Sequence, residues 1–170
     1  WRISQDLVWE KHNGSNLHSD RFSRVHEHAV LWYQGRWADR YHVTPTTPDA
    51  VRRTVRKKAR PAQWVGEVGA STYRSEDGGP RLMRSVIYAR SMHGRAINEA
   101  EKPSALLEPL ITYGCPPGGL VLDLFAGSCS TAVAARATGR RAVCFEERES
   151  QCEAAARRLD QGVFTFAEGC

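Results

Sequence analysis

The segment "GGLVLDLFAGSCSTAVAARATGRRAVCFEE" occupies residues 118–147 and decides the fold class of this chain. An apolar strand over 119–124 runs into a loop of small residues, and an alanine-rich helix over about 129–138 follows. A second strand over 141–146 and a helix over 148–160 complete the unit. Strands that alternate with helices pair in parallel through crossover connections, so the segment predicts an α/β fold with a doubly wound sheet.

The rest of the sequence predicts one more helix and several strands around this unit. Residues 103–114 start with a proline and end at a glycine, which is typical of a helix, although Pro109 lies inside it. A turn or flexible loop is expected over 13–16. Trp9 and Trp32 are interpreted as core residues. Further strands are expected at 6–11, within 24–35, at 82–90 and at 163–167.

Composition indicates an ordinary globular protein, because hydrophobic residues make up 41% and charged residues 25% of its 170 positions. No apolar run is long enough to span a membrane, and the first ten residues lack a signal-peptide pattern. Five cysteines without CxxC spacing argue against a disulfide framework or a structural zinc site. The six histidines form no metal-ligand set, so no metal is expected, and the expected location is the reducing cytoplasm.

The positive charge of the chain is unevenly spread. Residues 51–60, "VRRTVRKKAR", contain six basic residues and no acid, which favours a polyanion partner and above all nucleic acid. The alternative is a solvated loop. The surrounding stretch 36–80 shows no sustained periodicity and is either a functional insert or partly disordered. The candidate DNA-binding residues are Arg52, Arg53, Arg56, Lys57, Lys58 and Arg60.

The loop after the first strand of 118–147 has the composition of a ligand site. Ligands of parallel sheets bind beyond the carboxyl ends of the strands, where small residues let the backbone approach them. Asp123 ends one strand and Glu146 ends the next, at about the spacing expected of an acid that binds ribose hydroxyls. The loop lacks both the G-x-G-x-x-G pattern and the lysine of a P-loop, which favours a nucleoside without a phosphate chain. The alternative is a plain strand, turn and helix.

Three segments together resemble a known family. The segment 118–147 resembles the S-adenosylmethionine-binding motif of amino-group DNA methyltransferases, which modify adenine N6 or cytosine N4. "NEAEKPSALL" over 98–107 is similar to the family's H-P-T-x-K-P-x-x-L motif. "DLVWEKHNGSNLHSDRFSRVHEHAVLWYQG" over 6–35 is similar to W-x-K-x-N-G-S followed by R-x-x-H-E-x-x-L-x-Y. The order of the three segments is that of the subclass in which the catalytic half precedes the cofactor half.

The resemblance implies a Rossmann-like S-adenosylmethionine-dependent methyltransferase sheet that is permuted and partial, within a single domain over 1–170. Residues 1–35 would supply strands of the catalytic half, 36–80 would form a target-recognition insert, and 98–170 would form the cofactor-binding half. The implied partner is double-stranded DNA, which the basic block would contact through its phosphates.

The resemblance also implies a set of residues that bind S-adenosylmethionine. Glu146 would hold the ribose hydroxyls, and Asp123, Phe125 and Gly127 would line the methionine end and the adenine side. Lys102 would lie with its neighbouring proline against the same pocket. The full implied set is Lys102, Pro103, Asp123, Phe125, Gly127, Ser128, Cys129 and Glu146.

The family's catalytic D/N/S-P-P-aromatic motif is absent from this chain. Its only Pro-Pro pair lies in "CPPG" over 115–118, with neither the acid nor the aromatic residue. In this subclass the motif would precede Trp1, so no catalytic residue is expected here, and the sheet is expected to need a missing N-terminal segment or a second copy in a homodimer.

Cys129 stands where the family has glycine, and its β-carbon is expected to crowd the methionine or to require an unfavourable backbone angle. A nucleophilic role for Cys129 is the lesser alternative. Two other functions stay open at this point: a catalytically inactive remnant that binds DNA or cofactor, and a nicotinamide-dependent dehydrogenase on the same sheet.

Overall fold

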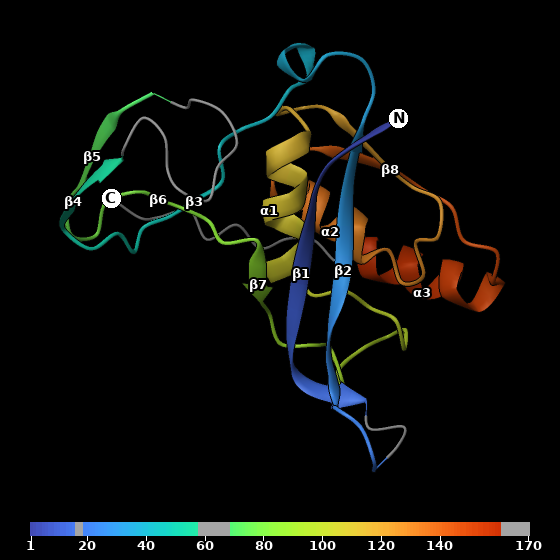
Figure 1. Cartoon of the computed structure of the whole chain (residues 1–170). Coiled ribbons are helices and arrows are strands. Elements are labelled where there is room, and N and C mark those ends of the chain that lie inside the picture. The colour runs from blue at the N-terminus through green and yellow to red at the C-terminus, as the bar shows by residue number, and fades with distance from the viewer. Residues whose placement is uncertain (16–18, 58–68, 161–170) are drawn as a thin grey trace, which may run out of the picture. The chain divides into compact units, whose positions relative to one another are not determined.

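The computed structural model describes residues 1–15, 19–57 and 69–160, and the chain divides into two compact units (Figure 1). The larger unit comprises Trp1–Val43 with Ser85–Cys170, and the smaller unit comprises Thr44–Arg84. The larger unit therefore carries every candidate cofactor residue, and the smaller unit carries the basic block. Within the described residues, no helix combines the length and the apolar character that a membrane span requires.

The amino-terminal strands of the larger unit form a three-stranded sheet with β7. Strand β1 (Arg2–Ser15) pairs antiparallel with β2 (Arg24–Tyr33) and parallel with β7 (Val86–Tyr88). Trp9 lies opposite Ile87 in this register, and both side chains are buried. The sheet thus brings together strands from both ends of the 36–80 stretch.

Strand β1 is longer than the sequence predicts. The expected strand ends at residue 11, whereas β1 continues to Ser15, so the expected turn over 13–16 is wrong for its first three residues. The pairing becomes irregular between Glu10 and Ser15. Gly14 lies so close to Ser23 that a β-carbon would collide with it, and glycine here serves close strand approach and not a turn.

The two tryptophans assigned to the core have different environments. Trp9 is buried, and its indole N–H donates to the Ala89 carbonyl at 2.8 Å, which confirms the expectation. Trp32 is 51% exposed, so its assignment to the core is wrong. Side chains alternate along β2, and the partly buried positions are those of Leu31 and Tyr33, which directs Trp32 to the opposite face.

The carboxyl-terminal half confirms the predicted alternation of helices and strands. Parallel pairing is observed between its two strands, Leu122 lying opposite Val143. The predicted strand over 163–167 lies outside the described residues. The elements are α1 (Ser104–Gly114), β8 (Leu120–Asp123), α2 (Ser130–Ala137), β9 (Arg141–Cys144) and α3 (Glu149–Asp160).

Both prolines of the α1 region are accommodated by the helix. Pro103 was expected at the first helical position. It occupies the N-cap with an extended backbone, and the helix begins one residue later, at Ser104. Pro109 lies inside α1 and does not end it, because the helix runs on to Gly114. The predicted helix is therefore confirmed at nearly its full length.

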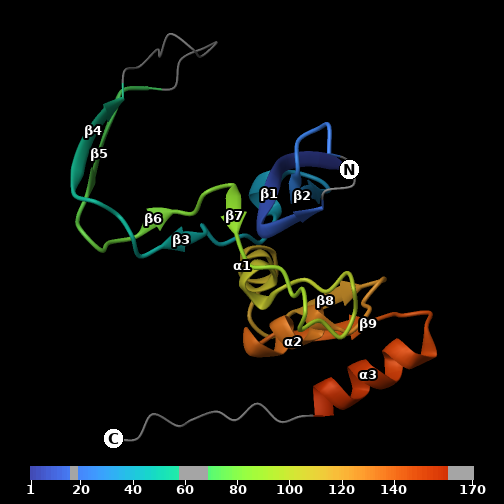
Figure 2. The same cartoon turned by 90° about the horizontal axis from the view of Figure 1, so that it is seen from below.

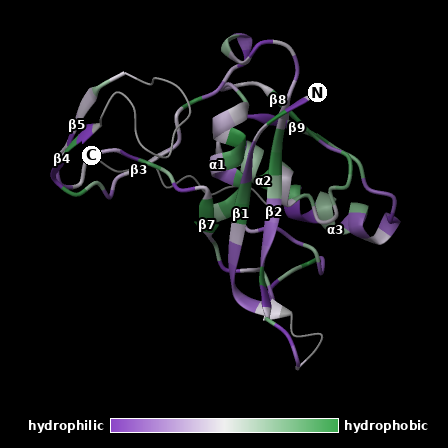
Figure 3. Cartoon of the chain, viewed as in Figure 1, coloured by the Kyte–Doolittle hydropathy of each residue, from purple (hydrophilic) through white to green (hydrophobic). Residues whose placement is uncertain are grey.

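Small residues let α2 pack closely against its neighbours. Ala134 and Ala135 are fully buried and form a core cluster with Ile111 of α1, against which Val121 and Ala142 of the strands pack. Figure 2 shows α1 between the three-stranded sheet and the layer that contains α2, β8 and β9. Figure 3 shows hydrophobic colour along α1 and β7 and hydrophilic colour over much of α3. On the side of β8 and β9 away from the helices, the exposed apolar residues are Leu120, Leu122 and Val143.

The 36–80 stretch contains several short elements. A 3-10 helix, η1 (Trp37–Asp39), belongs to the larger unit. The smaller unit contains two antiparallel ladders, and Ala50, which lies between β3 and β4 in the sequence, is buried. Elements of two to five residues are too short to give a periodic signal, which explains why the sequence shows none. The pairs are β3 (Thr46–Thr47) with β6 (Arg81–Leu82), and β4 (Arg53–Lys57) with β5 (Ser71–Ser75).

Candidate functional site

The loop that follows β8 is fixed to the ends of both parallel strands. The Phe125 amide donates to an Asp123 carboxylate oxygen at 3.0 Å, and the Thr131 hydroxyl donates to the other oxygen at 2.6 Å. The Ala126 amide donates to the Phe145 carbonyl at 2.9 Å. Asp123 therefore joins the start of the loop to the first turn of α2, and its carboxylate is used within the protein.

Glu146, which follows β9, reaches the same loop. Its Oε2 accepts a hydrogen bond from the Gly127 amide at 2.9 Å, and its Oε1 accepts from the Arg148 side chain at 3.0 Å and the Arg148 amide at 3.1 Å. The hydrogen bond from Arg148 is the largest influence that lowers the pKa of Glu146 below its usual value of 4.5. At neutral pH this side chain is a carboxylate that accepts hydrogen bonds only.

A cleft of about 530 Å³ opens between the loop and Glu146. Of the predicted cofactor-binding residues, Phe125, Gly127 and Glu146 line it. Phe125 is 91% exposed, so the faces of its ring are free to contact a ligand. The cleft thus combines an apolar wall with acidic side chains and a backbone segment. The other lining residues are Asn98, Ala100, Leu124, Phe145, Glu147 and Arg148.

Gly127 allows the loop to lie against the segment that precedes α1. Its φ is +52°, in the left-handed region that favours glycine. A β-carbon at this position would also collide with the side-chain amide of Asn98. Both observations favour glycine at 127, where the loop lies against Asn98. The close approach of this loop to a ligand stays a prediction.

Cys129 adopts a left-handed backbone conformation, with φ 56° and ψ 37°, at the N-cap of α2. It is the one residue other than glycine with positive φ in the described part of the chain. The expectation of an unfavourable backbone angle is therefore confirmed. Its side chain is buried with Ala126, Ala132 and Ala155 and is not among the residues that line the cleft.

The thiols of Cys129 and Cys144 are poor nucleophiles. Burial raises the pKa of Cys129 above its usual value, although a hydrogen bond with Cys144 opposes this. Burial, together with the nearby Cys129 and Asp123, raises the pKa of Cys144 to about 12. Both thiols are protonated at neutral pH, so the alternative of a cysteine nucleophile has no support from the site.

A buried acid that the sequence analysis did not single out fixes the rear of the loop. Glu101 has a side chain that is only 1% exposed, and it forms an ion pair with Arg158 of α3 at 2.9 Å. Its Oε2 accepts hydrogen bonds from the Ser128 hydroxyl and the Ile97 amide, both at 2.9 Å. Ser128, predicted to bind cofactor, thus lies behind the cleft and links the loop to this acid. Glu101 directly precedes the predicted Lys102-Pro103 pair, the only local signal that could have marked it.

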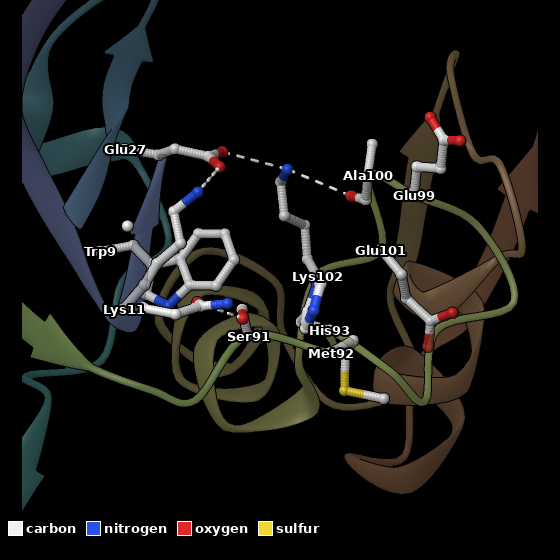
Figure 4. Close-up of a pocket in the computed structure, with 12 residues that line it drawn as sticks. Trp9, Lys11, Glu27, Ser91, Met92, His93, Glu99, Ala100, Glu101 and Lys102 are labelled. Carbon is white, nitrogen blue, oxygen red and sulfur yellow. Dashed lines mark hydrogen bonds and ion pairs between the residues drawn. The ribbon is translucent and has the colours of Figure 1, made fainter. Parts of the chain in front are cut away.

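Lys102 lies in a second, smaller pocket of about 190 Å³ (Figure 4). Its ammonium group pairs with Glu27 of β2 at 3.1 Å and lies 5.5 Å from the centre of the Trp9 ring. Lys11 of β1 pairs with the other oxygen of Glu27. Burial opposes ionisation of Glu27, but the hydrogen bonds from both lysines outweigh it and lower the pKa of this acid. Pro103 is buried beside this pocket and does not line either of the two pockets.

Ala100 lines both pockets, so the segment 98–102 separates them. Asn98 lies on the side of the larger cleft, and Lys102 lies on the side of the sheet. The structure therefore brings Phe125, Gly127 and Glu146 together, and it places Lys102 on the opposite side of one short segment.

The basic block lies in the smaller unit, and only part of it belongs to the described residues. Arg52 is paired with Glu76 at 2.9 Å, and its amide donates to Asp77. Arg53 and Arg56 are exposed on β4. Lys57 ends this strand, while Lys58 and Arg60 lie outside the described residues.

Comparison with known families finds a match over most of the chain. The family model described as DNA methylase, of the N6/N4 methyltransferase class, matches residues 1–157. The DNA adenine methyltransferase YhdJ of Escherichia coli (strain K12) is 42% identical over 68 residues, which are 40% of this chain and 23% of that protein. The type II methyltransferase M.ScaI of Streptomyces caespitosus is 39% identical over 71 residues, which are 42% of this chain and 23% of that protein. The chain spans less than half the length of the curated relatives that it matches.

Solved structures of similar fold confirm the predicted fold class. The crystal structure of M1.HpyAVI aligns with a TM-score of 0.59 at 18% identity, covering 93% of this chain and 60% of that one. The cytosine-N4-specific PvuII DNA methyltransferase aligns with a TM-score of 0.53 at 15% identity, covering 94% of this chain and 52% of that one. At these identities the likeness establishes the fold.

Proposed function

The chain belongs to the DNA methylase family, and from this premise we propose that it binds S-adenosylmethionine in the cleft between the β8–α2 loop and Glu146. We further propose that it serves in methyl transfer to an exocyclic amino group of adenine or cytosine in DNA. S-adenosylmethionine supplies the methyl group as an electrophilic sulfonium. The residues of this chain hold the donor and contact the DNA.

The observation that carries the proposal is the position of Glu146. Its carboxylate lines the cleft, is ionised at neutral pH, and is held in place by the Gly127 amide and by Arg148. Two carboxylate oxygens offer about four acceptor sites, of which the structure uses three. A further acceptor is left for the hydroxyls of a ribose, which are donors. An acid at this place suits a nucleoside better than it suits a phosphate.

The remaining lining of the cleft fits the other parts of the donor. Leu124, Phe125 and Phe145 are all more than half exposed and provide apolar surface for an adenine ring. Gly127 lines the cleft beside the side-chain amide of Asn98. The cleft offers no lysine, and Arg148 is engaged with Glu146, so a pyrophosphate has no free cation here among the lining residues. This argues against the nicotinamide-dependent alternative.

DNA recognition is assigned to the stretch 36–80, which includes most of the basic smaller unit. Its arginines and lysines suit the phosphates of a duplex. No residue of this chain is proposed to activate the target amino group, because its single Pro-Pro pair, Pro116-Pro117, lies between cysteine and glycine. The residues proposed here act in binding the donor and the DNA.

Isothermal titration calorimetry of the 170-residue chain tests the donor site directly. We expect S-adenosylmethionine and its demethylated product to bind with dissociation constants below about 1 mM, and NAD not to bind. Absence of binding by both methyl-donor ligands at millimolar concentration would overturn the proposal. Binding of NAD in their place would support the dehydrogenase.

Methyl transfer itself is tested by incubating the chain with labelled S-adenosylmethionine and unmethylated genomic DNA. Mass spectrometry of the digested nucleosides then separates N6-methyladenine from N4-methylcytosine. Donor binding without transfer is the expected result, because no residue of this chain is proposed to activate the target amino group. Transfer by this chain alone would contradict that part of the proposal.

A further inference from the structure

The smaller unit carries the whole net charge of the chain. Its residues, Thr44–Arg84, include nine Lys and Arg and four Asp and Glu, so its net charge is +5, which is also the net charge of all 170 residues. The rest of the chain is electrically balanced. A local excess of this size marks the smaller unit as the part that attracts a polyanion.

Strands β4 and β5 pair as an antiparallel ribbon (Figure 1), and their register sorts the side chains onto two faces. Directly opposite residues share a face, and successive residues alternate between faces. Val55 lies opposite Tyr73, and Arg53 lies opposite Ser75, whose buried hydroxyl donates to the Val51 carbonyl at 2.6 Å. This face is partly buried within the unit.

The other face is fully exposed and has a distinct composition. Thr54 lies opposite Arg74, and Arg56 lies opposite Thr72. All four side chains are exposed. We call this surface the Thr–Arg face. Residues two apart on a strand are separated by about 6.8 Å, so its two arginines lie diagonally across the ladder.

Unlike Arg52 and Arg81, the two arginines of the Thr–Arg face have no acidic partner within the described part of the unit. Arg52 is paired with Glu76 at 2.9 Å, and Arg81 is paired with Asp49 at 3.1 Å. Among the described residues, no Asp or Glu lies within 4.0 Å of the guanidinium of Arg56 or Arg74. Two positive charges therefore share one small face, and no acid among the described residues pairs with them. Such a face suits a binding partner that accepts hydrogen bonds.

We propose that the Thr–Arg face enters the major groove of duplex DNA and that Arg56 and Arg74 contact base edges there. The proposal rests on the proposed function, in which this chain acts on DNA. A two-stranded ribbon fits the width of the major groove. Arginine there forms paired hydrogen bonds with guanine, while threonine supplies a hydroxyl and a methyl group that contacts thymine. Threonine hydroxyls also contact phosphates, so base contact is argued from the ribbon geometry and from the two exposed arginines on one of its faces.

Lysine substitution separates base contact from phosphate contact. R56K and R74K keep the positive charge but lose the planar fork that bonds two guanine acceptors at once. Each variant and the wild-type chain would be incubated with a randomised duplex library, and bound DNA would be sequenced. We expect the wild type to enrich particular sequences, and each lysine variant to lower that enrichment about tenfold at one or two guanine positions. Affinity for bulk duplex DNA should change by less than about threefold, because the charge is conserved.

A control that removes one positive charge comes from Arg84, an exposed residue of the same unit that lies outside the hairpin. R84A should weaken binding to all sequences alike and leave the enriched sequence unchanged. If R56K and R74K also leave the enriched sequence unchanged, or if the wild type enriches none, the Thr–Arg face does not contact base edges. Preferential binding of single-stranded DNA or RNA would equally overturn the proposal.

The same variants distinguish this inference from the proposed function. R56K and R74K should bind S-adenosylmethionine as the wild type does, since the hairpin lies in the other unit. A chain that binds the methyl donor but enriches no DNA sequence would contradict only the Thr–Arg face. A chain that binds neither the donor nor DNA would contradict both.

Discussion

Glu101 and Arg158 form a buried ion pair at 2.9 Å that joins the segment before α1 to the last helix of the described chain. Glu101 also accepts the Ser128 hydroxyl, and Arg158 lies 3.4 Å from the Ser128 carbonyl. The rear of the proposed donor loop is therefore held by two residues that are distant from it in sequence. Ser128 is buried, so this pair supports the rear of the loop, while Asp123 and Glu146 hold its front.

Removing one partner of this pair should strongly destabilise the fold. R158M leaves the buried carboxylate of Glu101 without its cation, so we expect the free energy of unfolding to fall by about 3 kcal/mol. The matched control is R157M, which removes the exposed partner of Glu153 on the same helix and should cost less than about 1 kcal/mol. Urea denaturation followed by circular dichroism gives both values.

The double variant E101M/R158M distinguishes a lost pair from general damage to α3. With both charges replaced by apolar groups, we expect only part of the stability lost in R158M to return, because the Ser128 hydroxyl and the Ile97 amide then lose their acceptor. Equal unfolding energies for R158M and R157M would contradict a structural role of the buried pair.

The left-handed backbone of Cys129 predicts an unusual order of stability between two substitutions. C129A and C129G both remove the buried thiol, but only glycine adopts φ 56° without strain. We therefore expect C129G to be more stable than C129A by about 1 kcal/mol in thermal or urea unfolding. An alanine variant as stable as the glycine variant would contradict this account. Since the Cys129 side chain does not line the cleft, calorimetry should show the same donor affinity for C129G as for the wild type.

The parts of the fold that local sequence determines were predictable. Strand β8, helix α2 and strand β9 form from contiguous periodic segments, and the acid at Glu146 follows from its spacing after the loop. The Glu101–Arg158 pair was not predictable, because charged residues are usually exposed and because Arg158 lies in α3, far from Glu101 in the sequence. Trp32 was assigned to the core on its residue type, whereas the strand register places it on the surface.

The hairpin of the smaller unit shows the same limit. The basic block was visible as composition, but its division into two faces depends on pairing between β4 and β5, which lie on opposite sides of residues 58–68. Arg74 was therefore missed, although it shares a face with Arg56.

Glu146 should account for much of the donor affinity. E146Q keeps the size of the side chain but replaces one acceptor oxygen with a donor group, so we expect the dissociation constant for S-adenosylmethionine to rise about tenfold. E147Q is the matched control. Glu147 also lines the cleft, but the Gly127 amide donates to Glu146 and not to Glu147. Calorimetry of the two variants at pH 7 measures the difference. An equal loss in both variants would indicate a nonspecific charge effect and not a bond from Glu146.

The lowered pKa of Glu146 sets the pH window of its contribution. The Arg148 hydrogen bond lowers this pKa below 4.5, so the stabilisation is fully present above pH 4.5 and is lost as the pH falls through the lowered value. R148M should raise the pKa of Glu146 toward its usual value, so the acid-induced loss of stability should be smaller and should be complete at a higher pH. Carbon-13 NMR titration of the glutamate carboxyl carbons measures the pKa in both proteins. An unchanged pKa in R148M would assign the shift to the backbone hydrogen bonds.

Cys144 should resist alkylation in the folded protein. Burial, with Cys129 and Asp123 close by, raises its pKa to about 12, and only the thiolate reacts with iodoacetamide. At pH 8 we expect labelling roughly a thousandfold slower than for a free cysteine of ordinary pKa. Peptide mass spectrometry after timed labelling measures the rate at this position, and labelling in guanidinium chloride provides the control that the peptide is detected. Rapid modification of Cys144 in the native chain would contradict the buried thiol cluster behind the donor loop, since a reactive thiolate there would require the loop to open.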